Sequence, residues 1–343
     1  MKQYELNDKP ETAPLYDMEL YNKLALKVKQ TCNYNRSNIK ASMFKKMFIL
    51  CCIGLYAYLT YLCMLISSYV LKASVGFILG FLWVSIGFNS MHEGSHYALV
   101  KNANLNLLCS RLWNSFGLWN GDIWQLHHII YHHRFTGSDN DPDVYHLRPF
   151  YNKNNKKTLL KCPAFLFPLI LFIFPGYYLG QVIAYFLGYR SGKVFGMKIP
   201  TVRLSFVDLL LMISRLCILY IIGIHASIMH IISNNIFYGV NVLADHDTYE
   251  SLVENHYSGN DWLKLQVRTS ANFYTNSYVY TYSFGGISDQ TEHRLCPNMS
   301  SIRYKAISPI VRAFCREHDI KYTVHNSIYE IMQEYYKSLK HFN

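Results

Sequence analysis

The sequence predicts an all-α integral membrane protein, in which transmembrane helical hairpins carry a cytosolic helical cap that holds a histidine-rich metal site. Three observations lead to this fold class. Hydrophobic residues make up 51% of the 343 residues and charged residues only 16%, well below the share in ordinary soluble domains. Long apolar runs interrupt the polar sequence, and many of the 15 histidines lie just after those runs. The same composition excludes a disordered or collagen-like chain.

Charge and cysteine usage indicate where the protein works. The formal net charge of +11 is compatible with nucleic acid or with an anionic membrane surface. Because the apolar runs favour the membrane, no nucleic-acid partner is predicted. The nine cysteines are scattered without a CxxC pair, and an odd number argues against an extracellular disulfide framework. The first residues also show no basic-then-apolar signal peptide, so we expect a site that faces the reducing cytosol.

The predicted elements start with a polar cytosolic segment, residues 1–46, which ends in a basic cluster. A membrane domain is predicted for residues 47–325, and a C-terminal tail for residues 326–343. The four predicted spans are about 47–71, 73–91, 206–222 and 225–244. Only Lys72 separates the first two runs, so we expect a transmembrane hairpin that returns the chain to its starting side.

Prolines such as Pro168 and Pro175 break the apolar stretch 163–189, which is predicted to be a re-entrant or membrane segment. Two topologies fit this pattern. Either residues 206–244 form a second hairpin, or the stretches 163–189 and 206–244 each cross once. The first topology keeps the basic loop 190–204 on the cytoplasmic side and is preferred. Both topologies place the N-terminus, residues 92–160 and the tail on one face.

One charged residue lies inside an apolar run. Arg215 interrupts the stretch that begins at residue 206, and a charge at membrane depth is expensive and often functional. The alternative is a structural arginine that snorkels to the interface or pairs with another side chain.

Two groups of histidines have the spacing of metal ligands. His92 and His96 lie four residues apart at the polar end of the second run, so a helix places both imidazoles on one face. Neutral imidazole binds iron, zinc or copper. His128 and His132 repeat this spacing, and His133 is expected to point about 100° away from its neighbour, toward a second metal.

Two further histidines complete the candidate set. His246 follows the last apolar run, and His293 lies in a polar segment near the C-terminus. Asp139, Asp141 and Asp143 follow the second histidine group, where they either orient imidazole rings as hydrogen-bond acceptors or simply form a turn. Because seven imidazoles exceed what one metal accepts, two metals that share them are the simpler hypothesis.

A competing motif overlaps the first group. His92-Glu93-Gly94-Ser95-His96 matches HExxH, the zinc protease pattern in which the glutamate acts as general base. A zinc protease needs only three protein ligands, which would leave the other histidine groups without a role. No Asp-Gly pair occurs either, so an intramembrane zinc protease is the minor alternative.

Three motifs together resemble the histidine boxes of membrane fatty acid desaturases, most of all the front-end or acyl-lipid branch. They are HxxxH (His92, His96), HxxxHH (His128, His132, His133) and QxxH (Gln290, His293). The residues that flank these motifs are also similar, including Trp124, Arg134-Phe135-Thr136-Gly137 and Leu295-Cys296-Pro297. The resemblance covers about residues 45–325.

This resemblance implies a non-haem centre of two Fe ions that uses O₂ and two electrons to desaturate an acyl chain of a fatty acid or membrane lipid. The implied ligands are His92, His96, His128, His132, His133, His246 and His293. The sequence contains no His-Pro-Gly-Gly motif, so we expect an external electron donor, cytochrome b5 or ferredoxin. The implied location is a multi-pass membrane protein of the endoplasmic reticulum in a eukaryote, or of the inner membrane in a bacterium, with a cytosolic active site.

The sequence departs from the family pattern at one ligand position. The third box normally ends in two adjacent histidines, but here Arg294 follows His293, and arginine has no lone pair to give to iron. His127 is expected to point elsewhere, and His225, His230, His256 or His318 are candidate substitutes. Arg294 is expected to pair with Asp289 or a lipid headgroup and to weaken metal binding. Because of Arg294, one alternative is a metal-poor, non-catalytic paralogue. The other is a lipid hydroxylase on the same scaffold, since the same oxidant can transfer a hydroxyl group to carbon.

Overall fold

The computed structural model describes residues 16–35, 38–137, 140–145, 192–194, 197–199, 205–254 and 259–342. The expected membrane segment 163–189, Asp139 and His256 lie outside these residues. The described chain is mostly helical, in agreement with the sequence. Its helices and helical turns, in chain order, are α1 (Glu19–Thr31), α2 (Met43–Leu65), α3 (Tyr69–Ile86), η1 (Gly87–His92), α4 (Glu93–Ser95), α5 (Ala103–Phe116), α6 (Gly121–Trp124), η2 (Gln125–His132), α7 (His133–Phe135), η3 (Pro142–Tyr145), α9 (Phe206–Ile221), α10 (Ile224–His246), η5 (Glu250–Glu254), α11 (Trp262–Arg268), α12 (Tyr278–Ser283), α13 (Gln290–Leu295), η6 (Ser301–Arg303), α14 (Tyr304–Glu317) and α15 (Ile328–Phe342).

Two small sheets of three-residue strands accompany the helices. Strand β1 (Gly192–Val194) pairs antiparallel with β2 (Met197–Ile199). Strand β3 (Ala271–Phe273) pairs in parallel with β4 (Thr323–His325), which joins two segments about 50 residues apart in the chain. Neither sheet was expected from the sequence, because strands this short have no readable alternation of polar and apolar residues.

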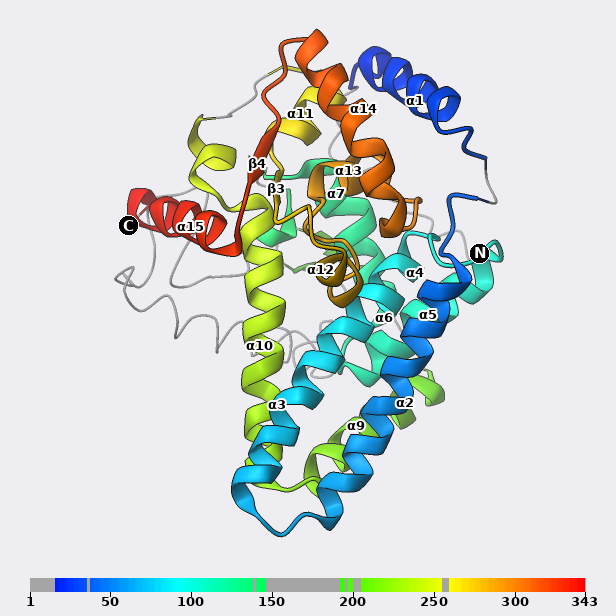
Figure 1. The fold of residues 1–343 in the computed structure, drawn as a ribbon, viewed down its shortest axis with the longest axis vertical. Helices are drawn as coiled ribbons and strands as arrows, with labels where there is room; N and C mark the ends of the chain where they lie inside the picture. Colours follow the sequence, from blue (N-terminus) through cyan, green and yellow to red (C-terminus); the bar gives the residue numbers. More distant parts are fainter. Residues whose placement is uncertain are drawn as a thin grey trace.

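Helices α2 and α3 form an antiparallel pair (Figure 1). Both α2 and the continuous helix Tyr69–Ser95 are long and apolar enough to cross a membrane. The turn between them lies at residues 66–68 and not at Lys72, which is part of α3. Ser68 sets this boundary, because its side chain accepts a hydrogen bond from the main-chain nitrogen of Leu71 and caps α3.

The apolar stretch 206–244 forms two helices, as predicted. Ser205 and Asp208 make a reciprocal capping box that starts α9. Gly223 separates α9 from α10 and has a φ of +84°, a left-handed conformation that a glycine adopts without a steric penalty. The observed helices start and end within two residues of the predicted 206–222 and 225–244.

Helices α3 and α10 run side by side along most of their length (Figure 1). Two glycines of α3, four residues apart, permit this close approach. A Cβ atom at Gly76 would overlap with the carbonyl oxygen of Ala226, and one at Gly80 would overlap with that of His230. Small residues at this spacing are typical of helices that pack tightly in a membrane.

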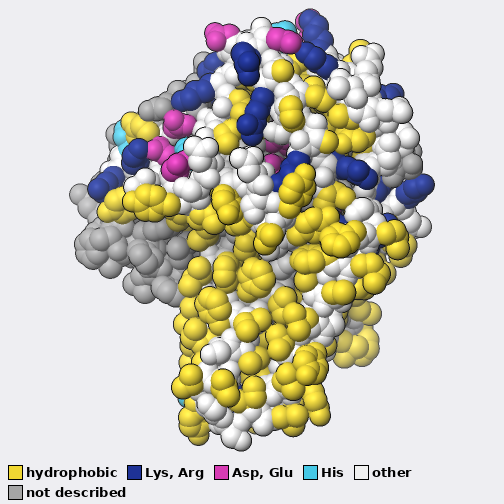
Figure 2. Space-filling model, viewed as in Figure 1, with side chains coloured by type: hydrophobic (Ala, Val, Ile, Leu, Met, Phe, Trp, Pro, Cys, Tyr) yellow, Lys and Arg dark blue, Asp and Glu magenta, His cyan; other side chains and the backbone are white. Residues whose placement is uncertain are grey.

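Apolar and charged side chains occupy different parts of the surface. Figure 2 shows hydrophobic side chains over the lower half of the molecule, around α2, α3 and α9, whereas lysines and arginines gather at the top. Leu50, Leu65, Val70 and Leu216 are each more than half exposed. Such a continuous apolar surface is not expected on a protein that is surrounded by water.

The cap above these helices has its own core. Helices α1, α11, α13 and α14 pack together at the top of the molecule (Figure 1). Leu24, Val267, Leu295 and Val311 are fully or almost fully buried where these helices meet. Because α13 carries His293 and Arg294, this core fixes the third histidine motif above the ends of α3 and α10.

Candidate metal centre

The first histidine motif lies where α3 leaves the apolar half of the molecule. The helix continues without a break from Tyr69 to Ser95, but its turn Gly87–His92 is π-helical. π-helical turns are rare and are frequent at functional sites. Asn89 stabilises this turn, since its amide donates to the carbonyl oxygens of Ser85 and Tyr282. His92 and His96 are both buried at the end of this helix.

Five histidines converge on one point. The Nε2 atom of His128 lies 2.9 Å from that of His92, 3.0 Å from that of His96 and 3.3 Å from that of His133. The ring of His293 completes the group, with its centroid 4.6 Å from that of His92 and 4.7 Å from that of His96. Three different parts of the chain thus bring imidazole nitrogens into contact.

The chemistry of this five-histidine cluster fits a metal cation. Burial, reinforced by neighbouring positive groups, lowers the pKa of His128, His133 and His293 well below its usual value, so these rings are neutral. A neutral imidazole has one N–H, and each ring nitrogen that faces its neighbours without a proton offers a lone pair. The Nε2 of His293 has no hydrogen-bond partner in the described chain. A cation at the centre would satisfy all of these nitrogens.

His132 and His246 form a second, smaller group beside the cluster. Their ring centroids lie 4.9 Å apart. The Nδ1 of His132 lies 3.0 Å from Asp141 Oδ1 and 3.1 Å from Asp143 Oδ2, and that of His246 lies 2.9 Å from the carbonyl oxygen of Thr269. Such contacts fix the ring and its tautomer and leave the Nε2 of His132 able to bind a metal, whereas the Nε2 of His246 lies 2.6 Å from the amide nitrogen of Gln290.

The distribution of histidines between the two groups differs from the prediction. His133 was expected to reach a second metal while His128 and His132 shared the first, but His133 joins His128 and His132 lies apart. The reason is the π-helical turn Gln125–His132, whose hydrogen bonds join residues five apart. Residues at this wider spacing, such as His128 and His133, are therefore brought together. His127 and His132 are related in the same way, and both contact Asp143.

Arg294 is fully buried between the histidines and the cap. Its Nε donates to Gln266 Oε1 at 2.9 Å, and its Nη2 donates to the carbonyl oxygen of His132 at 3.0 Å. Burial lowers the pKa of Arg294 to about 10, although the carboxylates of Asp141, Asp143 and Asp245 oppose this effect, so the guanidinium stays protonated. The expected pairing with Asp289 or a lipid headgroup is wrong, because Arg294 bonds to neither and no part of it reaches the surface.

The candidate substitutes for the missing histidine lie elsewhere. His225 stacks on Tyr69, His230 contacts Tyr56 within the apolar half, and His318 packs on Phe314 in the cap. His127 stacks on Trp124 and contacts Asp143, as its predicted direction implied. None of these described histidines belongs to either group.

The environment of Glu93 argues against the zinc protease alternative. Its carboxylate forms a buried ion pair with Lys45 and accepts hydrogen bonds from the hydroxyls of Ser300 and Ser301. A general base must instead face a metal-bound water. Glu93 therefore joins α2, the end of α3 and the cap, a structural role that the sequence motif did not reveal.

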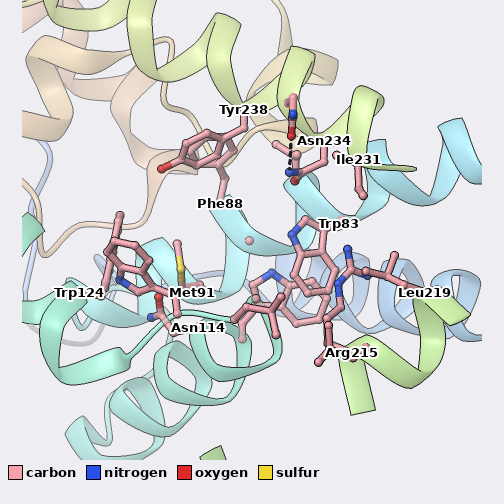
Figure 3. A pocket seen from close by; sticks show the side chains of 18 residues that line it. Trp83, Phe88, Met91, Asn114, Trp124, Arg215, Leu219, Ile231, Asn234 and Tyr238 are labelled. Atoms are coloured by element: carbon pink, nitrogen blue, oxygen red, sulfur yellow. Dashed lines mark hydrogen bonds between the residues drawn. The ribbon is translucent and has the colours of Figure 1, made fainter. Parts of the chain in front are cut away.

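A cavity of about 440 Å³ lies in the apolar half, between α3, α5, α9 and α10, and no histidine of the described chain lines it. Figure 3 shows Phe88, Tyr238 and Trp124 at one side and Arg215 with Trp83 at the other. Phe88, Tyr238 and Trp124 also line a smaller space of about 30 Å³ beside His92, His128, His132 and His246. Of the lining residues, only Trp124 and Arg215 stand out in the sequence by motif or charge, although Asn234 and Asn235, two amides inside an apolar run, also indicate a polar environment there.

Comparisons with known proteins agree with these features. A family model described as fatty acid desaturase matches residues 67–326. The chain is 25% identical over 320 residues to an acyl-lipid (8-3)-desaturase of Physcomitrium patens, covering 87% of this chain and 65% of the relative. It is also 25% identical over 287 residues to an sn-1 linoleoyl-lipid 6-desaturase of Synechocystis, covering 77% of this chain and 78% of the relative. The chain thus spans less than two thirds of the moss protein.

Proposed function

Because this chain belongs to the fatty acid desaturase family, we propose that it introduces a C=C bond into the acyl chain of a membrane lipid. In this reaction two hydrogens leave adjacent methylene groups, and O₂ is reduced to two waters with two further electrons and two protons. The observation that carries the proposal is the contact of four buried imidazoles and the half-buried His133 beside an apolar cavity. The relatives' names, which refer to acyl lipids and fatty acids, support the substrate class.

The donor set fits two iron ions of unequal ligation. His92, His96, His128, His133 and His293 would hold one ion, and His132 with His246 would hold the other. When bound, iron supplies the reaction with O₂ that zinc, which has no redox chemistry, does not. Asp141, Asp143 and the Thr269 carbonyl orient the rings of the second group.

The cavity positions the acyl chain and keeps water away from it. Aromatic side chains from η1, α6 and α10 form the wall between the cavity and the histidines, including Phe88, Trp124 and Tyr238. A cavity of about 440 Å³ has the size of an ordinary small-molecule site. A dry, close-fitting wall holds a flexible chain in one position and excludes competing reactions with water.

We also propose how the chain lies in its membrane. Helices α2 and α3, which are long and apolar enough to span a bilayer, would form one hairpin across it. Helices α9 and α10 would form the second, with the histidines and the cap on the cytosolic side. The apolar surface of these helices and the basic cap in Figure 2 support this orientation. The membrane domain would span residues 47–325, with the stretch 163–189 as a re-entrant or membrane segment. An external carrier, cytochrome b5 or ferredoxin, would deliver the electrons to the basic cytosolic face.

One observation favours a second candidate function. Arg294 occupies the position of a box histidine and brings a positive charge next to His132, which disfavours a second cation nearby. A chain that binds lipid without desaturating it is therefore the alternative. A hydroxylase on the same scaffold differs only in its product.

Fatty-acid profiling tests these possibilities. The chain is expressed in a host of known lipid composition, beside His132→Ala and the control variant His318→Ala in the cap. We expect a new fatty acid two mass units lighter than its precursor with the wild type and with His318→Ala, and none with His132→Ala. A gain of sixteen mass units would assign a hydroxylase. Unchanged lipids despite iron-loaded protein and a supplied reductase and carrier would refute both activities and leave lipid binding.

A further inference from the structure

Arg215 is a buried cation inside the apolar half of the molecule. It lies in the middle of α9, and only 6% of it is exposed. Its Nη1 donates to the hydroxyl of Tyr56 at 2.7 Å, and its Nη1 and Nη2 lie 3.2 and 3.3 Å from the two ring nitrogens of His230. Its guanidinium lies 3.9 Å from the centroid of Trp83. These partners are neutral or weakly polar groups, and none carries a negative charge.

No carboxylate of the described chain forms an ion pair with Arg215. The acidic residue of the same helix, Asp208, is bound by Arg111 through two hydrogen bonds of 2.9 and 2.5 Å. Residues 144–204, whose sequence immediately precedes α9, contain no aspartate or glutamate. An arginine at membrane depth is costly when its charge is not compensated, and such residues commonly mark a functional site.

Arg215 also lines the cavity that shares Phe88, Trp124 and Tyr238 with the small space beside the histidines. Figure 3 places it beside Trp83, on the side of the cavity opposite to Trp124. Trp83 precedes His92 by nine residues of one continuous helix, which corresponds to about 13 Å. A molecule that fills the cavity therefore has hydrocarbon-compatible walls along its length and a guanidinium at the end remote from the histidines. Two other buried polar atoms of the lining, Asn114 Oδ1 and Trp124 Nε1, have no hydrogen-bond partner in the described chain.

We propose that this cavity binds an alkyl chain that ends in a carboxylate, and that the carboxylate pairs with Arg215. The guanidinium is planar and matches a carboxylate with two parallel hydrogen bonds, and such a pair is strong where water is excluded. The carboxylate would supply the negative charge that the described part of the chain does not. The inference deepens the proposed function, because it assumes that the cavity is the substrate site and assigns the chemistry of the substrate's far end.

Two ligands share this chemistry. A free fatty acid would enter with its carboxylate first, and an acyl lipid would reach Arg215 with a carboxylate at the far end of its chain. Either ligand places hydrocarbon along Trp83, Phe88 and Trp124, toward the histidines.

Tryptophan fluorescence gives a direct test in the full-length protein. Four of the five tryptophans line the cavity, namely Trp83, Trp113, Trp119 and Trp124, whereas Trp262 packs on Tyr21 in the cap. Bromine quenches tryptophan on contact, so 9,10-dibromostearic acid and its methyl ester report binding in lipid nanodiscs. We expect the wild type to bind the acid at least about tenfold more tightly than the ester, after correction for partition into protein-free nanodiscs.

Variants assign this preference to the guanidinium. Arg215→Met should abolish the preference for the acid, and Arg215→Lys should retain part of it because it keeps the charge. Arg316→Met, which removes an exposed arginine of the cap, should bind like the wild type. Equal binding of acid and ester by the wild type would overturn the proposal even if Arg215→Met did not fold. An unchanged preference in folded Arg215→Met would overturn it as well.

Competition against the brominated acid separates the two ligand sources. Hexadecanoic acid represents the free acid, and a phosphatidylcholine with an azelaoyl chain, compared with the same lipid carrying a nonanoyl chain, represents the carboxylated lipid. If hexadecanoic acid or the azelaoyl lipid displaces the brominated acid, that competitor identifies the source of the carboxylate. If neither competitor displaces it, the proposal is wrong. The assay needs no metal and no electron donor, so a chain without desaturase activity can still pass it, and an active desaturase can still fail it.

Discussion

The guanidinium of Arg294 donates a hydrogen bond from Nη2 to the carbonyl oxygen of His132, 3.0 Å away. This contact places a fixed positive charge next to His132, which lies outside the five-histidine cluster. It also links the third histidine motif on α13 to the second motif on η2. The five-histidine cluster and the pair of His132 and His246 therefore have different electrostatic surroundings.

Replacing Arg294 with histidine should strengthen the second metal site. The change removes a positive charge and adds a neutral imidazole, so we expect the second iron to bind at least about tenfold more tightly. The measurement is iron per chain by mass spectrometry after dialysis against a graded chelator. Arg294→Gln serves as the control, since it removes the charge without adding a ligand and should give a smaller gain. Identical retention of iron by all three proteins would show that Arg294 does not limit metal binding.

Asp141 should matter for metal affinity although it is not itself a proposed ligand. Its carboxylate holds the His132 ring at 3.0 Å and also accepts from the main-chain nitrogen of Gly137 at 2.8 Å. Asp141→Asn weakens this orientation, and loss of such a contact typically lowers metal affinity about 10- to 100-fold. Competition between the protein and a metal-sensitive dye measures the change. Asp122→Asn on α6 is the matched control and should have no effect, whereas equal losses in both variants would count against the role of Asp141.

The buried pair of Lys45 and Glu93 should contribute to folding. Glu93→Gln leaves the lysine charge buried without its partner, which is expected to cost about 3–5 kcal/mol. Thermal unfolding in detergent should register this as a clearly lower midpoint. The double variant Lys45→Met, Glu93→Gln removes both charges and should regain much of the lost stability, as a double-mutant cycle would quantify. If Glu93→Gln had the same unfolding midpoint as the wild type, the ion pair would not contribute to stability.

The contact between α3 and α10 should not tolerate an added methyl group. Gly80→Ala would bring its Cβ against the carbonyl oxygen of His230, so we expect about 1–3 kcal/mol of destabilisation. Gly54→Ala on α2 is the control, because no atom lies within 4 Å of the added Cβ. It should be neutral or slightly stabilising, since alanine favours a helix more than glycine does. A similar loss in both variants would indicate a general effect of glycine replacement and not of helix packing.

Much of the architecture could be predicted because apolar runs and histidine spacing are local signals. The two helices of residues 206–244 and the histidines of the three motifs follow directly from the sequence. The partition of His132 and His133 did not, because spacing on an ideal α-helix carries no sign of a π-helical turn. The contact partners of Arg294 and Glu93 could not be predicted from the sequence either. Gln266 and Ser301 meet them only through the fold, more than 25 residues away in the chain.

The spread of the seven candidate histidines along the chain sets an order of events during synthesis. Helices α2 and α3 can enter the bilayer while the ribosome is still adding later residues, but His246 and His293 lie in the last third of the sequence. The nascent chain therefore holds only an incomplete set of imidazoles until α13 has left the ribosome and packed into the cap. Under the proposed function, metal loading is a late step in biogenesis, and a chain truncated before residue 293 would insert its first helices yet never complete the site.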